Sequence, residues 1–190
     1  MWPRLLLALL LLSLTSCIPV GDLGSYWART SLDPQLRGKW KRIAVSPDET
    51  IEHGYPIGET SELVEKDGAF ELTADRQMGP ILDAENKPMW PVKTLTIGRH
   101  RWLVLGRAPS WMVEYQFEGG YLDVCPVDLR DLAGFIDKRY PAAPNLEILS
   151  GVGVPLRITT FDATAFAVLR DFPGADGCPE RTFARFEKPR

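Results

Sequence analysis

Three cysteines and two histidines are the residues of this chain best suited to covalent, redox or metal chemistry. A thiolate is a nucleophile and a metal ligand, and two thiols can form a disulfide in an oxidising compartment. The histidines, His53 and His100, show no spacing to each other or to Cys17, Cys125 or Cys178 that is typical of a metal site. The sequence therefore predicts no metal and no cofactor, and the cysteines need another explanation.

Cys17 follows an N-terminal segment that has the features of a secretory signal peptide. Arg4 supplies a positive charge, Leu5 to Leu12 are apolar, and small residues precede the cysteine. The apolar run is shorter than the ~20 residues needed to cross a bilayer. We therefore expect residues 1–16 to be removed as a signal peptide. The alternative is a buried N-terminal helix, but the run has no polar face to turn to water.

The residues Leu14-Thr15-Ser16-Cys17 resemble the lipobox of bacterial lipoproteins. The resemblance implies that Cys17 becomes the mature N-terminus and carries a diacylglyceryl group, usually with a further acyl chain such as palmitate on its amine. Two or more acyl chains attach a protein stably to a membrane. Because Ile18 rather than an aspartate follows the cysteine, the resemblance favours the outer membrane, facing the periplasm. The alternative is an ordinary signal peptide with Cys17 as a spare thiol.

With Cys17 assigned to the lipid, two cysteines remain. An oxidising periplasm favours a disulfide between Cys125 and Cys178. Closing a loop of this length constrains the unfolded chain by roughly 4 kcal/mol in the entropy model. Metal binding is the rival explanation, and it would need further ligands that the sequence does not supply.

Composition limits the class of partner. The chain of 190 residues has a formal charge of −3 and no cluster of basic residues. Nucleic-acid binding depends on neutralising phosphates, so we expect no nucleic-acid partner. The length fits one domain with a sizeable core. The predicted organisation is a signal peptide over 1–16, an acylated N-terminus and tether over 17–35, and a single β-rich domain over 36–190.

Alternating apolar and polar residues, interrupted by turn signals, predict a mainly β fold. Asp67-Gly68, Gly98-Arg99 and Gly119-Gly120 each mark a turn between two strand-like segments. Along 111–118 the alternation indicates a strand with one buried and one largely wet face. We expect an antiparallel barrel or strongly curved sheet of about seven to nine strands. Loops are expected over 46–60 and 78–91.

Helices are expected only in the last third of the chain. Apolar residues at helical spacing, with Asp128 at the start and Pro141 after the end, predict a helix over 128–140. A second segment, 162–172, favours a helix capped by Asp162, with an extension of the preceding strand as the alternative. The acids Asp123, Asp128 and Asp131 are best explained as a helix cap and a solvated surface.

Gly38-Lys39-Trp40 resembles the Gly-x-Trp motif at the start of lipocalins. In that family the tryptophan closes one end of an eight-stranded barrel, and an arginine from the last strand packs across its ring. The resemblance implies this role for Arg185. The chain departs from the family in having a helix before at least two further strands. A different β-barrel or curved sheet with added helices is therefore the alternative fold.

No motif of a known catalytic class is present: there is no Gly-x-Ser-x-Gly, His-Glu-x-x-His, phosphate-binding or dinucleotide-binding pattern. We therefore predict a non-catalytic lipoprotein that binds an apolar small molecule or an envelope protein. Trp90, between Pro88 and Pro91, is the predicted contact for a ligand or partner. The alternatives are a periplasmic hydrolase that uses His53 or His100, both of which are expected at the surface, and a purely structural envelope component.

Overall fold

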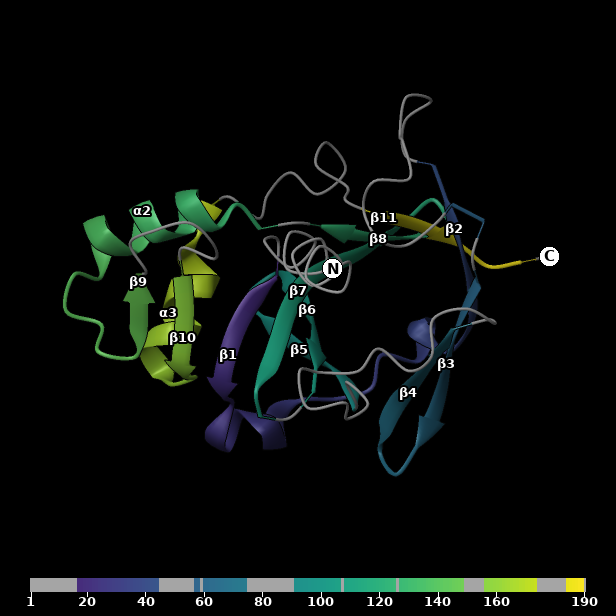
Figure 1. The fold of residues 1–190 in the computed structure, drawn as a ribbon, viewed down its shortest axis with the longest axis horizontal. Coiled ribbons are helices and arrows are strands. Elements are labelled where there is room, and N and C mark those ends of the chain that lie inside the picture. Colours follow the sequence, from purple (N-terminus) through teal and green to yellow (C-terminus); the bar gives the residue numbers. More distant parts are fainter. Residues whose placement is uncertain are drawn as a thin grey trace, which may run out of the picture.

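The computed structural model describes residues 17–44, 57–58, 60–74, 91–106, 108–125, 127–148, 156–173 and 184–189. Over these residues the chain forms one sheet of eleven strands, two 3-10 helices and two α-helices (Figure 1). The strands are β1 (Ile18–Asp22), β2 (Gly38–Ile43), β3 (Thr60–Lys66), β4 (Ala69–Ala74), β5 (Val92–Ile97), β6 (His100–Leu105), β7 (Ser110–Glu118), β8 (Tyr121–Cys125), β9 (Leu146–Ile148), β10 (Leu156–Thr160) and β11 (Ala184–Glu187). The helices are η1 (Gly24–Arg29), η2 (Pro34–Leu36), α2 (Leu129–Arg139) and α3 (Ala163–Asp171). The prediction of a mainly β fold is confirmed.

The centre of the architecture is a closed ring of eight strands, each antiparallel to its neighbours. The order around the ring is β2, β3, β4, β5, β6, β7, β8 and β11, and β11 pairs with β2 to close it. The β4–β5 junction is the shortest, with Phe70 opposite Val92 as its one pair in register among the described residues. The expected strand number fits the ring but not the whole sheet, because no hydrophobic pattern marks β1 or β9 as strands.

The three predicted turns are confirmed, and each joins two neighbouring strands of the ring. Between β3 and β4, Asp67 and Gly68 have φ angles of 51° and 73°. This left-handed backbone matches the twist of the flanking strands and is the conformation that an Asp-Gly pair favours. The expected loops over 46–60 and 78–91 fall largely outside the described residues.

The N-terminal segment is part of the fold, so the predicted tether over 17–35 is wrong. β1 pairs antiparallel with β7 and parallel with β10, and Ile18 is fully buried. A Cβ atom on Gly21 would lie 2.4 Å from the carbonyl oxygen of Thr159 in β10. Glycine is therefore required here by the close approach of two backbones, whereas the sequence pattern suggests a flexible segment.

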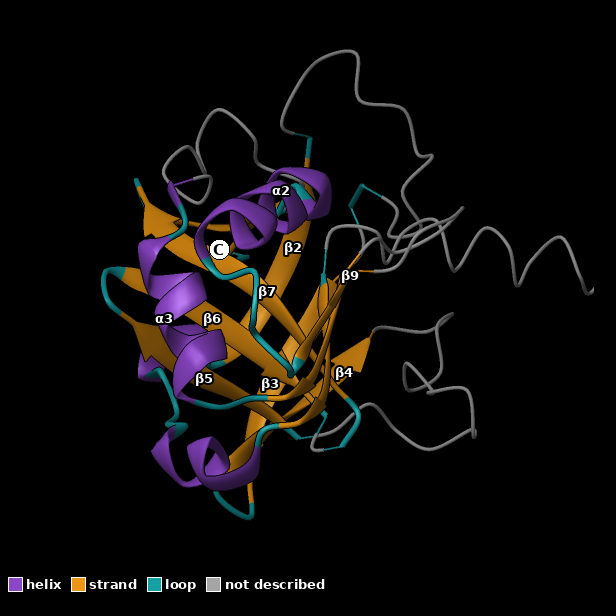
Figure 2. Cartoon of the chain, turned by 90° about the vertical axis from the view of Figure 1, so that its left-hand side faces the viewer, coloured by secondary structure: helices purple, strands orange, loops and turns teal. Residues whose placement is uncertain are grey.

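A second layer covers one side of the ring (Figure 2). β1, β9, β10, η1, α2 and α3 share an apolar core with the outward-facing residues of β5, β6 and β7. As a result both faces of β7 are covered: Met112 is fully buried and Glu114 is 7% exposed. The prediction of one wet face for this strand is wrong, because the second layer occupies the position that the alternation assigns to solvent.

Both predicted helices are confirmed. Asp128 caps α2 by accepting hydrogen bonds from the backbone N–H groups of Arg130 and Asp131, at 2.9 and 3.1 Å. Asp162 caps α3 by accepting from the N–H of Ala165 at 2.9 Å. The alternative for residues 162–172, a continuation of the strand, is therefore wrong.

Candidate functional site

The inside of the ring is lined by apolar side chains that alternate with outward-facing ones along each strand. These inward-facing residues form a cluster distinct from the core of the second layer. The buried members of this inner cluster are Leu36, Trp40, Leu63, Phe70, Val92, Leu103, Val113, Tyr115 and Leu122. We call the end of the ring at which β2 begins the proximal end, and the end at which β2, β4, β6 and β8 finish the distal end.

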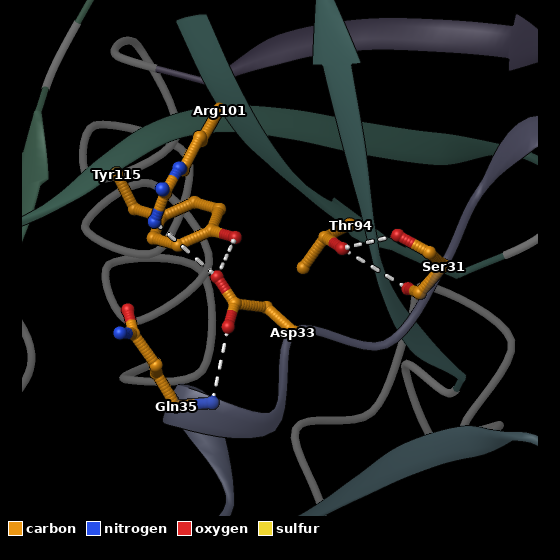
Figure 3. A network of polar contacts seen from close by, with 6 residues as sticks. All are labelled: Ser31, Asp33, Gln35, Thr94, Arg101 and Tyr115. Carbon is orange, nitrogen blue, oxygen red and sulfur yellow. Dashed lines mark hydrogen bonds and ion pairs between the residues drawn. The ribbon is translucent and has the colours of Figure 1, made fainter.

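Residues 31–36 lead into β2 and close the proximal end of the ring (Figure 3). Ser31 and Thr94 exchange two backbone hydrogen bonds of 2.8 Å, so this segment continues the pairing of β5. Leu36 is fully buried in the inner cluster. The segment is therefore fixed to the ring by both backbone pairing and apolar packing.

Asp33 is the centre of a polar network at this end. It accepts hydrogen bonds from the Tyr115 hydroxyl at 2.9 Å and from the Gln35 N–H at 3.0 Å, and the Arg101 guanidinium lies 3.5 Å away (Figure 3). Burial, and then the bond to Asp33, raise the pKa of Tyr115 well above its usual value. The phenol is thus a neutral donor near pH 7, which suits a structural contact.

Trp40 sits beside this closure. Its indole Nε1 donates a hydrogen bond of 2.6 Å to the carbonyl oxygen of Leu36, and its ring lies 5.9 Å from that of Phe117. The cation over the Trp40 ring is Lys188, with Nζ 4.9 Å from the ring centre. Gly38 has φ of 105°, a backbone conformation that side chains other than hydrogen rarely adopt.

Arg185 does not pack on Trp40, which corrects the role implied by the lipocalin resemblance. Its guanidinium binds both carboxylate oxygens of Asp123, at 2.6 and 2.9 Å, and lies 5.3 Å from the ring centre of Tyr121. The reason is the period of two along β11: Phe186 faces the inside, so Arg185 faces the outside. Asp123, the partner of Arg185, is fully buried, so the predicted position of Asp123 on a solvated surface is wrong.

The distal end of the ring has a partly exposed apolar lining. The half-buried side chains packed against the inner cluster near this end are Cys17, Leu72, Leu105 and Val124. Arg42 follows Trp40 on the inward-facing side of β2 and is 1% exposed. The sequence signal for this buried charge is its even spacing from Trp40, because alternate residues of a strand share a face.

The cysteines differ in their surroundings. Cys17 has a free thiol, and burial raises its pKa to about 11. Cys125 is 2% exposed at the end of β8. Cys178 lies outside the described residues, so its pairing with Cys125 stays a prediction. Trp90, the predicted contact residue, also lies outside them.

His100 is buried, which corrects its expected surface position. Its Nδ1 lies 2.8 Å from Oε1 of Glu114, and the two side chains are 4% and 9% exposed. The second layer explains this, since both residues face outward from the ring into the shared core of β5–β7 and the helices. His53 lies outside the described residues. In the part of the chain that the structure describes, no His, Cys, Asp or Glu side chains gather as three or more potential metal ligands.

A surface pocket of about 400 Å³ lies at the short β4–β5 junction. Its lining combines two lysines, two acids and the rings of Trp27 and Phe70. Lys66 pairs with Glu71 at 3.2 Å, and Lys93 Nζ lies 4.9 Å from the Trp27 ring centre. Both lysines of the pocket are therefore engaged, one with an acid and one with an aromatic ring.

Comparison with known proteins gives no relative: no family model, curated protein or solved structure matches the chain significantly. Among the described residues, no helix has the length and apolar character needed to cross a bilayer.

Proposed function

We propose that this protein is a bacterial envelope lipoprotein that binds an apolar small molecule inside its ring of strands and performs no catalysis. One observation carries the proposal. Most inward-facing side chains of the ring strands are apolar, with Arg42 as a buried exception, and those at the distal end, such as Leu105 and Val124, are only half-buried. Concave apolar linings of this kind favour the burial of apolar ligand surface.

The lipid anchor is proposed from Leu14-Thr15-Ser16-Cys17 and the apolar run before it. Removal of residues 1–16 would make Cys17 the mature N-terminus, with acyl chains on its sulfur and amine. The outer membrane, facing the periplasm, is the proposed location.

A lipocalin-like arrangement is the proposed architecture. Its support is the closed antiparallel ring, the Gly38-Lys39-Trp40 motif on the first ring strand, and a cation on the Trp40 face. The departures are substantial: Lys188 replaces the expected Arg185, and α2, β9, β10 and α3 separate the last two ring strands. The second layer would be an addition of this chain to such a ring.

The alternative is that the protein binds another envelope protein through Trp90, the predicted contact residue. A periplasmic hydrolase is less well supported. Of its two candidate bases, His100 is enclosed with Glu114. A purely structural role is the third alternative. The ligand-binding experiment below distinguishes it from the binding of an apolar small molecule.

Ligand binding can be tested with the mature domain carrying Cys17→Ser and the apolar fluorophore N-phenyl-1-naphthylamine. We expect saturable enhancement of its fluorescence. Leu105→Glu, which places a charge on the half-buried distal lining, should weaken binding by at least about tenfold, or ~1.4 kcal/mol. Val64→Glu is the matched control, because Val64 is 45% exposed on β3. Far-UV circular dichroism checks that both variants fold.

Two results would refute this binding site: the absence of saturable enhancement, and equal weakening by both variants. The anchor is tested separately by growing cells with labelled palmitate. Incorporation should occur in the natural chain and be absent in Cys17→Ser. Label that persists in the variant would exclude Cys17 as the acylated residue.

A further inference from the structure

Cys17 occupies a defined position in the wall of the ring. Glu114 of β7 pairs with Trp102 of β6 on one edge and with Cys125 of β8 on the other. Met112 likewise pairs with β6 on one edge and with Ile18 of β1 on the other. β8 and β1 therefore follow one another along the same edge of β7. Cys17 lies at the junction between them, near the distal end.

The side chain of Cys17 faces the inside of the ring. It packs against the inner cluster, whereas Ile18, the next residue, is fully buried in the core of the second layer. This opposite orientation is the alternation of a strand. On the outside of the same wall, Val127 and Leu132 belong to the buried core of the second layer. A large group on the sulfur is therefore directed inward and away from this layer.

No spacer separates Cys17 from the folded body. β1 begins at Ile18 and is hydrogen-bonded on both edges, to β7 and β10. The proximal end is closed by residues 31–36, with Leu36 buried and Asp33 bound to Tyr115. Half-buried apolar side chains lie at both ends of the ring, and Leu105 and Val124 are those at the distal end, which is the end nearer to Cys17. An acyl chain is most stable beside apolar side chains of this kind, because its own apolar surface then stays out of water.

We propose that the lipid on Cys17 leaves the fold through the distal end of the ring, so that this end is seated on the bilayer and the interior opens toward the membrane. The proposal rests on the proposed acylation of Cys17. It also names the ligand class: the occupant of the distal lining is a membrane amphiphile whose acyl chain enters from the bilayer that holds the protein. With an anchor attached to the wall itself, the ring cannot turn its distal end away from the surface.

The orientation can be tested by photocrosslinking of the acylated protein in vesicles of phosphatidylethanolamine and phosphatidylglycerol. p-Benzoylphenylalanine replaces Ala44, exposed just after β2 at the distal end, or Glu118, exposed at the end of β7 at the proximal end. We expect phospholipid adducts at position 44 and none above background at position 118. A third protein carries a flexible spacer of about twenty Gly/Ser residues between Cys17 and Ile18, which would span roughly 25 Å. Its adducts at position 44 should be lost.

Intact-mass measurement of the same samples separates the two proposals. If Cys17 is acylated but positions 44 and 118 react equally, or if the spacer leaves the adducts at position 44 unchanged, the orientation is wrong and the anchor stands. If the mass shows no acyl group on Cys17, the anchor and the orientation both fall. Circular dichroism of the spacer protein verifies that the domain is folded.

Discussion

Lys188 places its ammonium group 4.9 Å from the centre of the Trp40 ring, at the proximal end of the strand ring. Three residues earlier, Arg185 turns to the outside of β11 and binds the fully buried carboxylate of Asp123. Arg185 and Lys188 thus serve different contacts, and their removal should have different effects on stability.

Arg185→Ala should lower the free energy of unfolding more than Lys188→Ala. The first change leaves the carboxylate of Asp123 without its bidentate partner, at a cost of about 2–3 kcal/mol after allowance for the partial exposure of Arg185. The second removes an exposed cation–π contact worth about 0.5–1 kcal/mol. Urea unfolding followed by tryptophan fluorescence measures both. Equal losses would mean that the contact between Arg185 and Asp123 is not stabilising.

Two glycine-to-alanine changes should act in opposite directions. Gly38 has φ of 105°, so Gly38→Ala should cost about 1–3 kcal/mol through backbone strain. Gly134 lies in α2, and a Cβ atom added to it would have nothing within 4 Å, so Gly134→Ala should stabilise by about 0.5–1 kcal/mol through helix propensity. Thermal unfolding of the two variants checks the signs. A neutral Gly38→Ala would show that the strand start relaxes without strain.

The Tyr115 hydroxyl should remain protonated in solutions alkaline enough to ionise ordinary tyrosines, because its pKa is raised by burial and by the bond to Asp33. Tyr115→Phe should therefore leave the absorbance change at 295 nm up to about pH 11 unaltered. The same variant should lose about 1–2 kcal/mol of stability, because Asp33 loses a donor. A smaller absorbance change in the variant would show that Tyr115 titrates normally.

The cap of α3 should give stability that depends on pH. Burial alone would raise the pKa of Asp162, but hydrogen bonds from Ala165 and Asn145 outweigh it, and the pKa is lowered in the folded state. The resulting stabilisation is complete above the ordinary carboxyl pKa of about 3.9 and is lost as pH falls through the lower folded value. Asp162→Ala should cost about 1–2 kcal/mol at pH 7.

The pH dependence supplies the check on Asp162. In urea unfolding of the natural chain and the variant, the gap between their unfolding free energies should narrow below pH 4. If the difference in unfolding free energy stays constant on acidification, the substitution acts through packing and not through the charge of Asp162. Asp128→Ala at the start of α2 is a suitable comparison, since it removes the other helix cap.

Much of the sheet could be predicted because its signals are local. Asp67-Gly68 fixes a hairpin through its own backbone preference, and Asp128 marks a helix start through its own side chain. β1 could not be predicted in this way. Gly21 is present for the approach of Thr159, which is distant in sequence, and only the folded chain shows that neighbour.

The candidate site was predicted less well, for a related reason. The motif Gly38-Lys39-Trp40 marks the right strand, but the partner of Trp40 depends on which side of β11 each residue faces. Phe186 and Lys188 share the inner side, and this parity could have been read from the chain. The burial of His100 has no such local sign, because it depends on the second layer that covers the outward face of β6.

The parallel pairing of β1 with β10 also has a consequence for the order of folding. Val20 lies opposite Ile158, and Ile18 opposite Met112, so the first strand has both neighbours far downstream. Contacts of such high sequence separation form slowly, because the loop between them must close first. A chain made from its N-terminus therefore holds β1 unpaired until β7 has emerged, and leaves the other edge of β1 unpaired until β10 has followed. The strand of the sheet that is synthesised first is therefore among the last to be paired on both edges.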